Sequence, residues 1–225
     1  MAVIGWGSKA TGTHGAGKAA YYRMGTGGEE SRMRQGERVN ATTPHAARIR
    51  TPFAVLGIRT AGGAVTGIEY LPITERAQAP ANALAERVVR QVERYLADPH
   101  FRFTLPLAAI GTPFRQRVWQ ALAGIPVGES RTYGELARLL HTAPRAVGGA
   151  CGANTIALVI PCHRVVGSHG SLGGFMSAKG RPERELLPLG GKARSVKGAP
   201  ICAADGDPIA IKRWLLTHEG YRFGA

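Results

Sequence analysis

The chain has 225 residues, 44% of them hydrophobic, and a formal net charge of +14. This length and composition allow one large or two small domains with a packed core. No apolar run approaches the length of a membrane span, and the first two dozen residues lack the apolar stretch of a secretory signal. Three cysteines are too few for a disulfide scaffold. We therefore expect a soluble, cytoplasmic protein with reduced thiols and no membrane partner.

The positive charge is concentrated in the C-terminal half of the chain. Residues 101–225 hold 16 Lys and Arg against 7 Asp and Glu, whereas residues 51–100 hold five of each kind. A positive surplus attracts the phosphate backbone of nucleic acid, and it also suits an acidic membrane surface. Charge alone does not decide between these partners.

Residues 1–47 are rich in Gly, Ala, Ser and Thr and show no sustained period of 2 or 3.6. Such a segment buries too little apolar surface to fold, so we expect a disordered basic tail. The pattern changes after Thr51, where β-rich runs at 53–58 and 64–71 flank Ala61-Gly62-Gly63. Strand-like runs joined by a glycine turn predict a β-hairpin.

Apolar residues recur at helical spacing over residues 81–97, with charged residues on the opposite face. This period predicts one amphipathic helix that packs on the hairpin sheet. The segment 106–111 is interpreted as the crossing to a second lobe. We therefore expect an N-terminal α/β lobe at residues 48–106 and a second lobe at residues 107–225.

The second lobe opens with signals for helix starts. Thr112-Pro113 predicts one start, because threonine caps a first turn and proline suits its first position. Thr132-x-x-Glu135 is a capping box, which predicts a short helix from Tyr133 to Leu140. The side chains expected to face inward from this helix are Leu136, Leu139 and Leu140.

A further short helix is predicted from Thr142-Ala143-Pro144 towards Asn154, and two short helices joined by a tight turn suggest a helix-turn-helix. Its three glycines disfavour a helix by roughly 1 kcal/mol each against alanine, so another requirement must favour them. Tight helix packing is one explanation. The other is a smooth helix that enters a narrow DNA groove, with Arg145 projecting from one end.

The sequence Pro161-Cys162-His163-Arg164-Val165 follows an apolar run at residues 157–160. Free cysteines are more often inert buried residues than nucleophiles, so the surrounding residues must decide the role of Cys162. The spacings of Cys151, Cys162 and His163 match no common zinc-ligand pattern. We therefore expect no metal site.

Several stretches together resemble one family. They are Arg145-Ala-Val-Gly-Gly-Ala, Asn154, Ile160-Pro161-Cys162-His163-Arg164-Val165-Val166-Gly167, Gly170-Ser171-Leu172-Gly173-Gly174-Phe175 and Trp214-Leu215-Leu216-Thr217-His218-Glu219-Gly220. Over residues 51–175 and 211–220 the chain resembles the O6-alkylguanine-DNA alkyltransferases, or methylated-DNA–protein-cysteine methyltransferases. The resemblance implies an α/β (α+β) fold with an N-terminal ribonuclease-H-like lobe and a C-terminal helical lobe that contains the helix-turn-helix.

The resemblance also implies a reaction. Double-stranded DNA containing O6-alkylguanine would bind through its minor groove, and the damaged base would be flipped out because its alkyl carbon is unreachable inside the stack. The alkyl group would then pass irreversibly to Cys162, once per molecule. No cofactor and no metal are implied, and we expect a monomer. The preferred alkyl group and the acceptance of O4-alkylthymine stay open.

On the DNA side, the family pattern gives roles to residues of the predicted helix-turn-helix. Arg145 matches the residue that fills the space left by the flipped base. Tyr133 matches a tyrosine that crowds the phosphate of the rotating nucleotide. Ala146 and Gly149 are expected on the DNA-binding face of the same helix.

At the reaction centre, His163 matches the residue that takes the thiol proton, by the family's example through a water, and Glu219 matches the carboxylate that stabilises the imidazolium. Arg164 is expected to form a structural ion pair. Asn154 would brace the turn between the recognition helix and an active-site strand. The other expected structural and pocket residues are Pro161, Val165 and Phe175.

The chain departs from the family pattern in a few places. The residues concerned are Thr155, Phe175 and Met176, where proline, tyrosine and a small residue are usual. The missing tyrosine hydroxyl predicts the loss of a pocket hydrogen bond to the base. An insertion at about residues 177–208 separates the pocket loop from Glu219, and Cys202 within it is expected to be an exposed spectator thiol.

Other classes of function remain to be weighed. A non-catalytic sensor of alkylated DNA would lack the acceptor cysteine, whereas Cys162 is present. A helix-turn-helix regulator signalling through Cys162 would be expected to carry an appended cysteine-rich sensor domain. A Cys/His/Glu hydrolase would need an oxyanion hole and a peptide cleft, which the sequence neither shows nor excludes.

Overall fold

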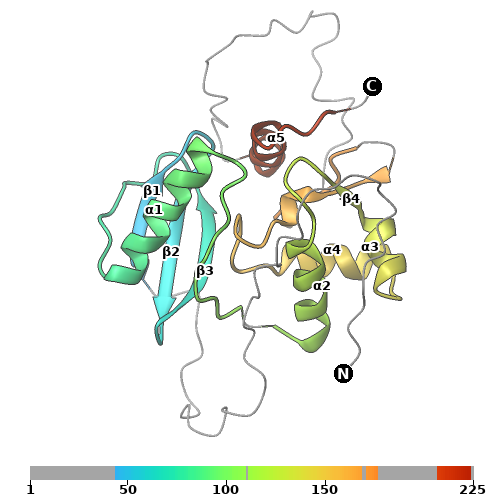
Figure 1. Cartoon of the computed structure of the whole chain (residues 1–225), viewed down its shortest axis with the longest axis horizontal. Helices are drawn as coiled ribbons and strands as arrows, with labels where there is room; N and C mark the ends of the chain where they lie inside the picture. Colours follow the sequence, from blue (N-terminus) through green and yellow to red (C-terminus); the bar gives the residue numbers. More distant parts are fainter. Residues whose placement is uncertain (1–43, 110, 169–170, 177–206, 224–225) are drawn as a thin grey trace, which may run out of the picture.

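In the computed structural model, two lobes with helix α5 between them form a mixed α/β fold, as predicted (Figure 1). The described residues are 44–109, 111–168, 171–176 and 207–223. Most of the expected N-terminal tail and of the expected insertion, including Cys202, lies outside these ranges. Within these ranges no helix is both long and apolar enough to span a bilayer.

The N-terminal lobe is built on an antiparallel sheet with strands β1 (Ala47–Arg50), β2 (Val55–Ala61) and β3 (Ala64–Leu71) in that order. The predicted hairpin is confirmed, and both residues of its turn, Gly62 and Gly63, have positive φ (57° and 76°). Glycine adopts this conformation without steric cost. The sequence does not predict β1, whose first residue, Ala47, falls in the expected tail. Ala47 is fully buried, so the sheet begins inside that segment.

Helix α1 (Ala83–Ala97) packs along one face of this sheet (Figure 1). The predicted helix over residues 81–97 is therefore confirmed, with a later start. The start is fixed by Asn82, whose side chain accepts a hydrogen bond from the backbone N–H of Ala85. The residues that α1 buries lie on one stripe and are Ala85, Val88, Gln91, Val92 and Tyr95.

The second lobe contains helices α2 (Pro113–Ala123), α3 (Tyr133–Leu139) and α4 (Pro144–Gly152). Their predicted starts are confirmed: Thr112 caps α2, and the side chains and backbones of Thr132 and Glu135 form the reciprocal capping box of α3. The expected inward position of Leu139 is wrong, because its side chain is 43% exposed. The buried stripe of α3 is centred on Leu136 and Ala137, which leaves Leu139 at its edge.

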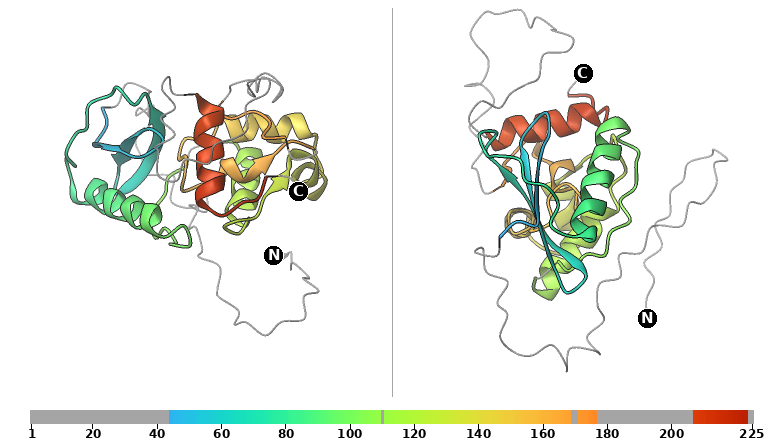
Figure 2. Two further views of the ribbon diagram at one scale, coloured as in Figure 1. Left: turned by 90° about the horizontal axis from the view of Figure 1, so that it is seen from above. Right: turned by 90° about the vertical axis from the view of Figure 1, so that its left-hand side faces the viewer.

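Two short strands and a final helix complete the second lobe. Strand β4 (Arg131–Thr132) pairs in parallel with β5 (Val165–Val166). Helix α5 (Pro208–His218) is capped by the Asp207 side chain and lies between the lobes in the left view of Figure 2. The last residue of the expected insertion, Pro208, is therefore the first residue of α5.

Backbone hydrogen bonds join strand β3 to the segment that leads to Cys162. The Ile68 N–H donates to the Thr155 carbonyl (2.9 Å), and the Ala157 N–H donates to the Ile68 carbonyl (2.9 Å). Buried apolar side chains of both lobes belong to one continuous core. The N-terminal lobe is thus in direct contact with the chain that carries the conspicuous cysteine.

Candidate active site

Cys162 lies on a turn that precedes the short strand β5. The Cys162 N–H donates to the Ile160 carbonyl (2.8 Å) across Pro161, whose φ of −82° and ψ of 65° are those of an inverse γ-turn. Proline suits this turn because its ring fixes φ near the required value. A single turn of 3-10 helix, Cys162–Arg164, follows. The thiol is 7% exposed, so it is buried but close to the surface.

Asn154 connects the end of helix α4 to this turn. Its side-chain amide donates to the Ile160 carbonyl (2.9 Å) and to the Cys162 sulfur (3.4 Å). Its side-chain oxygen accepts from the Ile156 N–H (3.0 Å). One asparagine therefore fixes both ends of the apolar segment and also contacts the sulfur directly. The hydroxyl of the neighbouring Thr155 takes no part in these bonds.

His163 and Glu219 form a buried pair behind the cysteine. His163 Nε2 lies 3.0 Å from Glu219 Oε1, and both side chains are fully buried. The expected ion pair of Arg164 is confirmed: its guanidinium donates to both oxygens of Glu219, at 2.8 and 2.9 Å. The Tyr95 hydroxyl of α1 donates to the same Oε1 (2.9 Å). Glu219 is thus held from both lobes despite its distance in sequence from Cys162.

Burial and hydrogen bonding set the ionisation of these groups. Burial raises the pKa of the Cys162 thiol, and the Asn154 hydrogen bond and the Lys212 charge partly oppose the rise. Burial lowers the pKa of His163, which keeps the imidazole neutral, although Glu219 works against it. Burial would raise the pKa of Glu219, but the bonds and charges of His163 and Arg164 lower it below the usual value. The site therefore rests as a neutral imidazole beside an ionised carboxylate.

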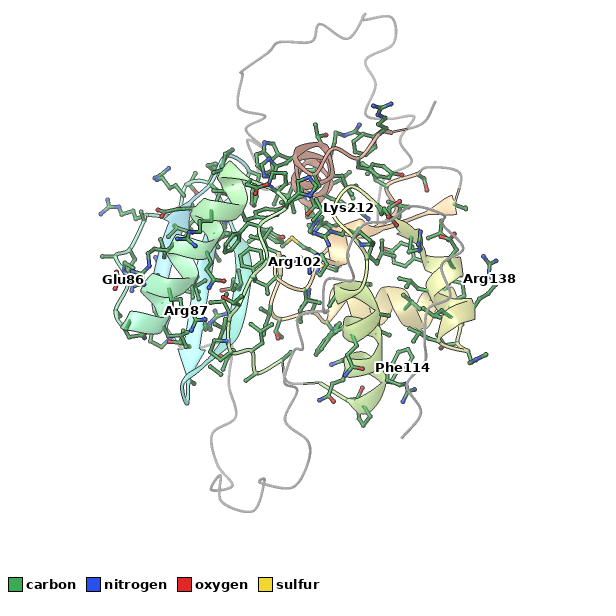
Figure 3. The ribbon with its side chains drawn as sticks, in the orientation of Figure 1. Glu86, Arg87, Arg102, Phe114, Arg138 and Lys212 are labelled. Atoms are coloured by element: carbon green, nitrogen blue, oxygen red, sulfur yellow. The ribbon has the colours of Figure 1, made fainter. Side chains whose placement is uncertain are left out.

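Lys212 is a site residue that the sequence analysis misses. It is fully buried and donates to the carbonyls of Val165, Leu172 and Gly174. Burial lowers its pKa to about 8. Figure 3 places it near the centre of the molecule under α5, whereas Arg138 points outward from the edge. A signal was available, because Lys212 occupies a position within the apolar stripe of α5.

Tyr133 packs between helix α4 and the pocket loop. Its hydroxyl donates to the Gly174 carbonyl (3.0 Å), and its ring lies 3.8 Å from where a Cβ of Gly148 would be. Gly173, with φ of 65°, approaches the ring even more closely. Close packing therefore favours glycine at Gly173, whereas a Cβ at Gly148 would make only ordinary van der Waals contact with the ring. By contrast, no atom lies within 4 Å of the Cβ position of Gly149, among the residues whose placement is described.

The expected DNA-contacting residues other than Tyr133 share helix α4. Arg145 is exposed in its first turn, Gly149 is exposed and Ala146 is half-buried. Val147 and Ala150 of the same helix face the core. The helix thus presents small residues and one arginine outward. Asn154, whose side chain bonds the Cys162 sulfur, follows shortly after the end of this helix.

Two expected pocket residues lie beside the thiol segment. Val165 is fully buried in β5 and Phe175 is 5% exposed. The Phe175 ring lies 5.8 Å from the Tyr70 ring of β3 and 5.9 Å from Lys212 Nζ. The described residues contain no group of three or more His, Cys, Asp and Glu side chains that could hold a metal ion. The chemistry available here is that of a thiol with an adjacent proton acceptor.

Known proteins share this arrangement of sequence and fold. The family described as 6-O-methylguanine DNA methyltransferase, DNA binding domain, matches residues 113–192. A methylated-DNA–protein-cysteine methyltransferase of Mycobacterium tuberculosis is 38% identical over 151 residues, 64% of this chain and 91% of that protein. The chain belongs to the methylated-DNA–protein-cysteine methyltransferase family.

Two further relatives define the extent of the likeness. A crystal structure of Mycobacterium tuberculosis OGT in complex with DNA matches with a TM-score of 0.56 and 33% identity, covering 76% of this chain and 90% of that one. The regulatory protein ada of Salmonella typhimurium is 50% identical over 98 residues, but the match spans only 28% of that protein. Similarity to these methyltransferases therefore extends over both lobes. Similarity to the regulator is confined to 43% of this chain.

Proposed function

We propose that the chain repairs O6-alkylguanine in double-stranded DNA by one irreversible transfer of the alkyl group to Cys162. The observation that carries this proposal is the thiol on its turn, hydrogen-bonded by Asn154 and adjacent to the buried His163–Glu219 pair. A thiol, a neutral base and a fixed carboxylate are the groups required for nucleophilic transfer. Membership of the methyltransferase family supports the same reaction.

The transfer is a displacement at the alkyl carbon. His163 takes the thiol proton at Nδ1 while Nε2 keeps its hydrogen bond to Glu219, so the imidazolium forms beside a carboxylate. The thiolate of Cys162 then forms a bond to the alkyl carbon as the bond from that carbon to guanine O6 breaks. The released guanine takes up the proton. The thioether that remains has no route back to a thiol, so each molecule reacts once.

Access to the base requires the second lobe. We propose that α3 and α4 act as a helix-turn-helix, with Ala146 and Gly149 against the minor groove and Arg145 in the space of the flipped base. The exposure of Arg145 and the open face at Gly149 support this role. Tyr133 would act from the side of the pocket loop, close to the phosphate of the rotating nucleotide. Asn154, Pro161, Val165 and Phe175 would shape the pocket.

The broader organisation is proposed on the same basis. The N-terminal lobe, residues 48–106, would be ribonuclease-H-like, and residues 107–225 would form the alkyltransferase and DNA-binding lobe, with an insertion at about 177–208. The enzyme would act as a monomer in the cytoplasm, where it meets DNA. It would require no cofactor.

Mass spectrometry of the reacted protein tests the assignment. After incubation with a duplex oligonucleotide containing O6-methylguanine, the peptide with Cys162 should carry one added methyl group, and the peptides with Cys151 and Cys202 should carry none. Cys162→Ala should accept no methyl group. Methylation of a different cysteine, or an unchanged yield in Cys162→Ala, would overturn the proposal.

A further inference from the structure

The side chain of Tyr70 reaches the active site from the N-terminal lobe. Tyr70 lies on β3, two residues beyond Ile68, whose backbone pairs with Thr155 and Ala157. Its ring lies 6.0 Å from the Phe53 ring and 5.8 Å from the Phe175 ring. The residue is only 8% exposed. A tyrosine of the sheet is therefore buried against the wall of the proposed guanine pocket.

The Tyr70 hydroxyl has an unusual environment. Among the described residues, the buried side-chain nitrogen and oxygen atoms without a hydrogen-bond partner are the Tyr70 hydroxyl and His163 Nδ1. Burial raises the pKa of Tyr70, the Cys162 thiolate adds more to that rise than Tyr95 or Glu219, and the nearby backbone of Leu158 partly opposes it. Both unpartnered atoms thus belong to residues around the same sulfur.

A buried hydroxyl without a partner is unfavourable for folding. Phenylalanine would fill the same space without that penalty, so the packing of the sheet alone does not explain a tyrosine here. Buried polar atoms that lack protein partners commonly share an ordered water, which typically makes about three hydrogen bonds. The Tyr70 hydroxyl and His163 Nδ1 are two such atoms, and the Cys162 sulfur, which already accepts a bond from Asn154, can be a third partner of the same water.

We infer that Tyr70 is a further residue of the transfer reaction, whose hydroxyl and His163 Nδ1 together hold one water molecule beside the Cys162 sulfur. The S–H bond breaks as its proton passes to this water and the water passes a proton to Nδ1. Tyr70 keeps its own proton and donates a hydrogen bond to the water, which stabilises the thiolate as it forms. This inference rests on the proposed function of Cys162. Tyr70 also supplies a hydroxyl at the pocket, where Phe175 stands in place of the tyrosine that is usual in the family.

Other groups around the sulfur affect its ionisation and must be kept constant in a test. They are Lys212 of α5, Cys151 of α4, Tyr133 of α3 and the His163–Glu219 pair. Burial raises the pKa of Cys151 to about 12 and also raises the pKa of Tyr133, so both stay neutral. Lys212, with its pKa lowered to about 8, loses charge within the working range. Its titration is common to every variant and cancels in a comparison.

The test compares Tyr70→Phe with wild-type protein and with Tyr221→Phe, a matched loss of a hydroxyl beyond α5. The pH dependence of carboxamidomethylation of Cys162 by iodoacetamide is followed by peptide mass spectrometry, from about pH 6 to 10. Single-turnover methyl transfer and the melting temperature are measured on the same proteins. For Tyr70→Phe we expect the pH midpoint of Cys162 carboxamidomethylation to rise by about one unit. Methyl transfer near pH 7 should be about tenfold slower, because the variant loses a hydrogen bond that stabilises a charged group. Its melting temperature should not fall, and Tyr221→Phe should match wild type.

Two results would overturn the inference. One is a Tyr70→Phe protein whose midpoint and transfer rate equal those of wild type. The other is a Tyr70→Phe protein with a lower melting temperature and slower transfer by the same factor at every pH, which indicates a packing role. If the wild-type protein takes up no methyl group, the proposed function fails, and the iodoacetamide titration still decides the role of Tyr70.

Discussion

The hydroxyl of Tyr95, in the N-terminal lobe, donates a 2.9 Å hydrogen bond to the same oxygen of Glu219 that lies 3.0 Å from His163 Nε2. The backbone carbonyl of Tyr95 is in turn 2.9 Å from His218 Nε2. One residue of α1 therefore contacts both the carboxylate and its neighbour at the end of α5. The N-terminal lobe thus holds the carboxylate of the buried His163–Glu219 pair in place.

Replacement of Tyr95 by phenylalanine should destabilise the protein. The variant removes a buried hydrogen bond to a charged group, which contributes about 1.5–3 kcal/mol. The free energy of unfolding, measured by denaturant titration, should fall by an amount in this range. Tyr221→Phe, which removes the hydroxyl of a half-buried tyrosine after α5, serves as the control. Equal stability of Tyr95→Phe and wild type would show that the bond contributes nothing to the interface between the lobes.

Stability should fall in acid, with Glu219 as a main cause. A carboxyl group whose pKa is lower in the folded than in the unfolded chain stabilises the fold above its unfolded value, about 4.3. This contribution is lost as the pH falls from there towards the lowered pKa of folded Glu219. Neutral, buried His163 adds a loss that begins below about pH 6.5, because the unfolded imidazole binds a proton more readily.

Glu219→Gln separates these contributions. The variant should be less stable at neutral pH, since Arg164 loses its buried partner, and its stability should vary less than that of wild type below about pH 5. Denaturant titrations at a series of pH values give both curves. Parallel curves for the two proteins in acid would contradict the assigned ionisation of Glu219.

Lys212 should support the thiolate through its charge. Lys212→Met leaves the carbonyls of Val165, Leu172 and Gly174 without their donor and removes the cation that lowers the pKa of Cys162. The rate of Cys162 carboxamidomethylation near pH 7 should fall several-fold. Arg213→Met removes the same charge at the next position of α5 and should react at the wild-type rate. Equal rates for both variants would assign Lys212 a purely structural role.

Arg145 should act on duplex DNA and not on the chemistry. Arg145→Ala should slow transfer from a duplex much more than transfer from free O6-methylguanine, because only the duplex requires a base to be replaced in the stack. Arg138→Ala, an exposed arginine of α3, controls for the general loss of positive charge. Equal slowing of Arg145→Ala with both substrates would rule out a role in base flipping.

Local signals predicted much of the fold. The glycine turn of the hairpin, the helical period of α1 and the caps at Thr112 and Thr132 each act over a few residues, so the sequence shows them directly. Strand β1 was missed because it is short and follows a segment without a repeating pattern. The inverse γ-turn at Pro161 was not predicted, because a short buried apolar run has no period that indicates its conformation.

The candidate nucleophile and base, Cys162 and His163, were assigned through the family resemblance, whereas other contacts of the site depend on tertiary packing. Tyr95 and Tyr70 come from the N-terminal lobe, and their hydroxyls meet the site only because β3 pairs with the segment before Cys162. Lys212 lies within the apolar stripe of α5, which indicates a buried position. No pattern in the sequence states that its amine reaches three carbonyls of the pocket loop.

The stoichiometry of methyl transfer tests the central claim most directly. A fixed amount of protein is given increasing amounts of a duplex with radiolabelled O6-methylguanine, and protein-bound label is measured at completion. A plateau at one methyl group per molecule, absent in Cys162→Ala, is the predicted result. Label that is released from the protein, or guanine repaired beyond one equivalent, would contradict a single-use acceptor at Cys162.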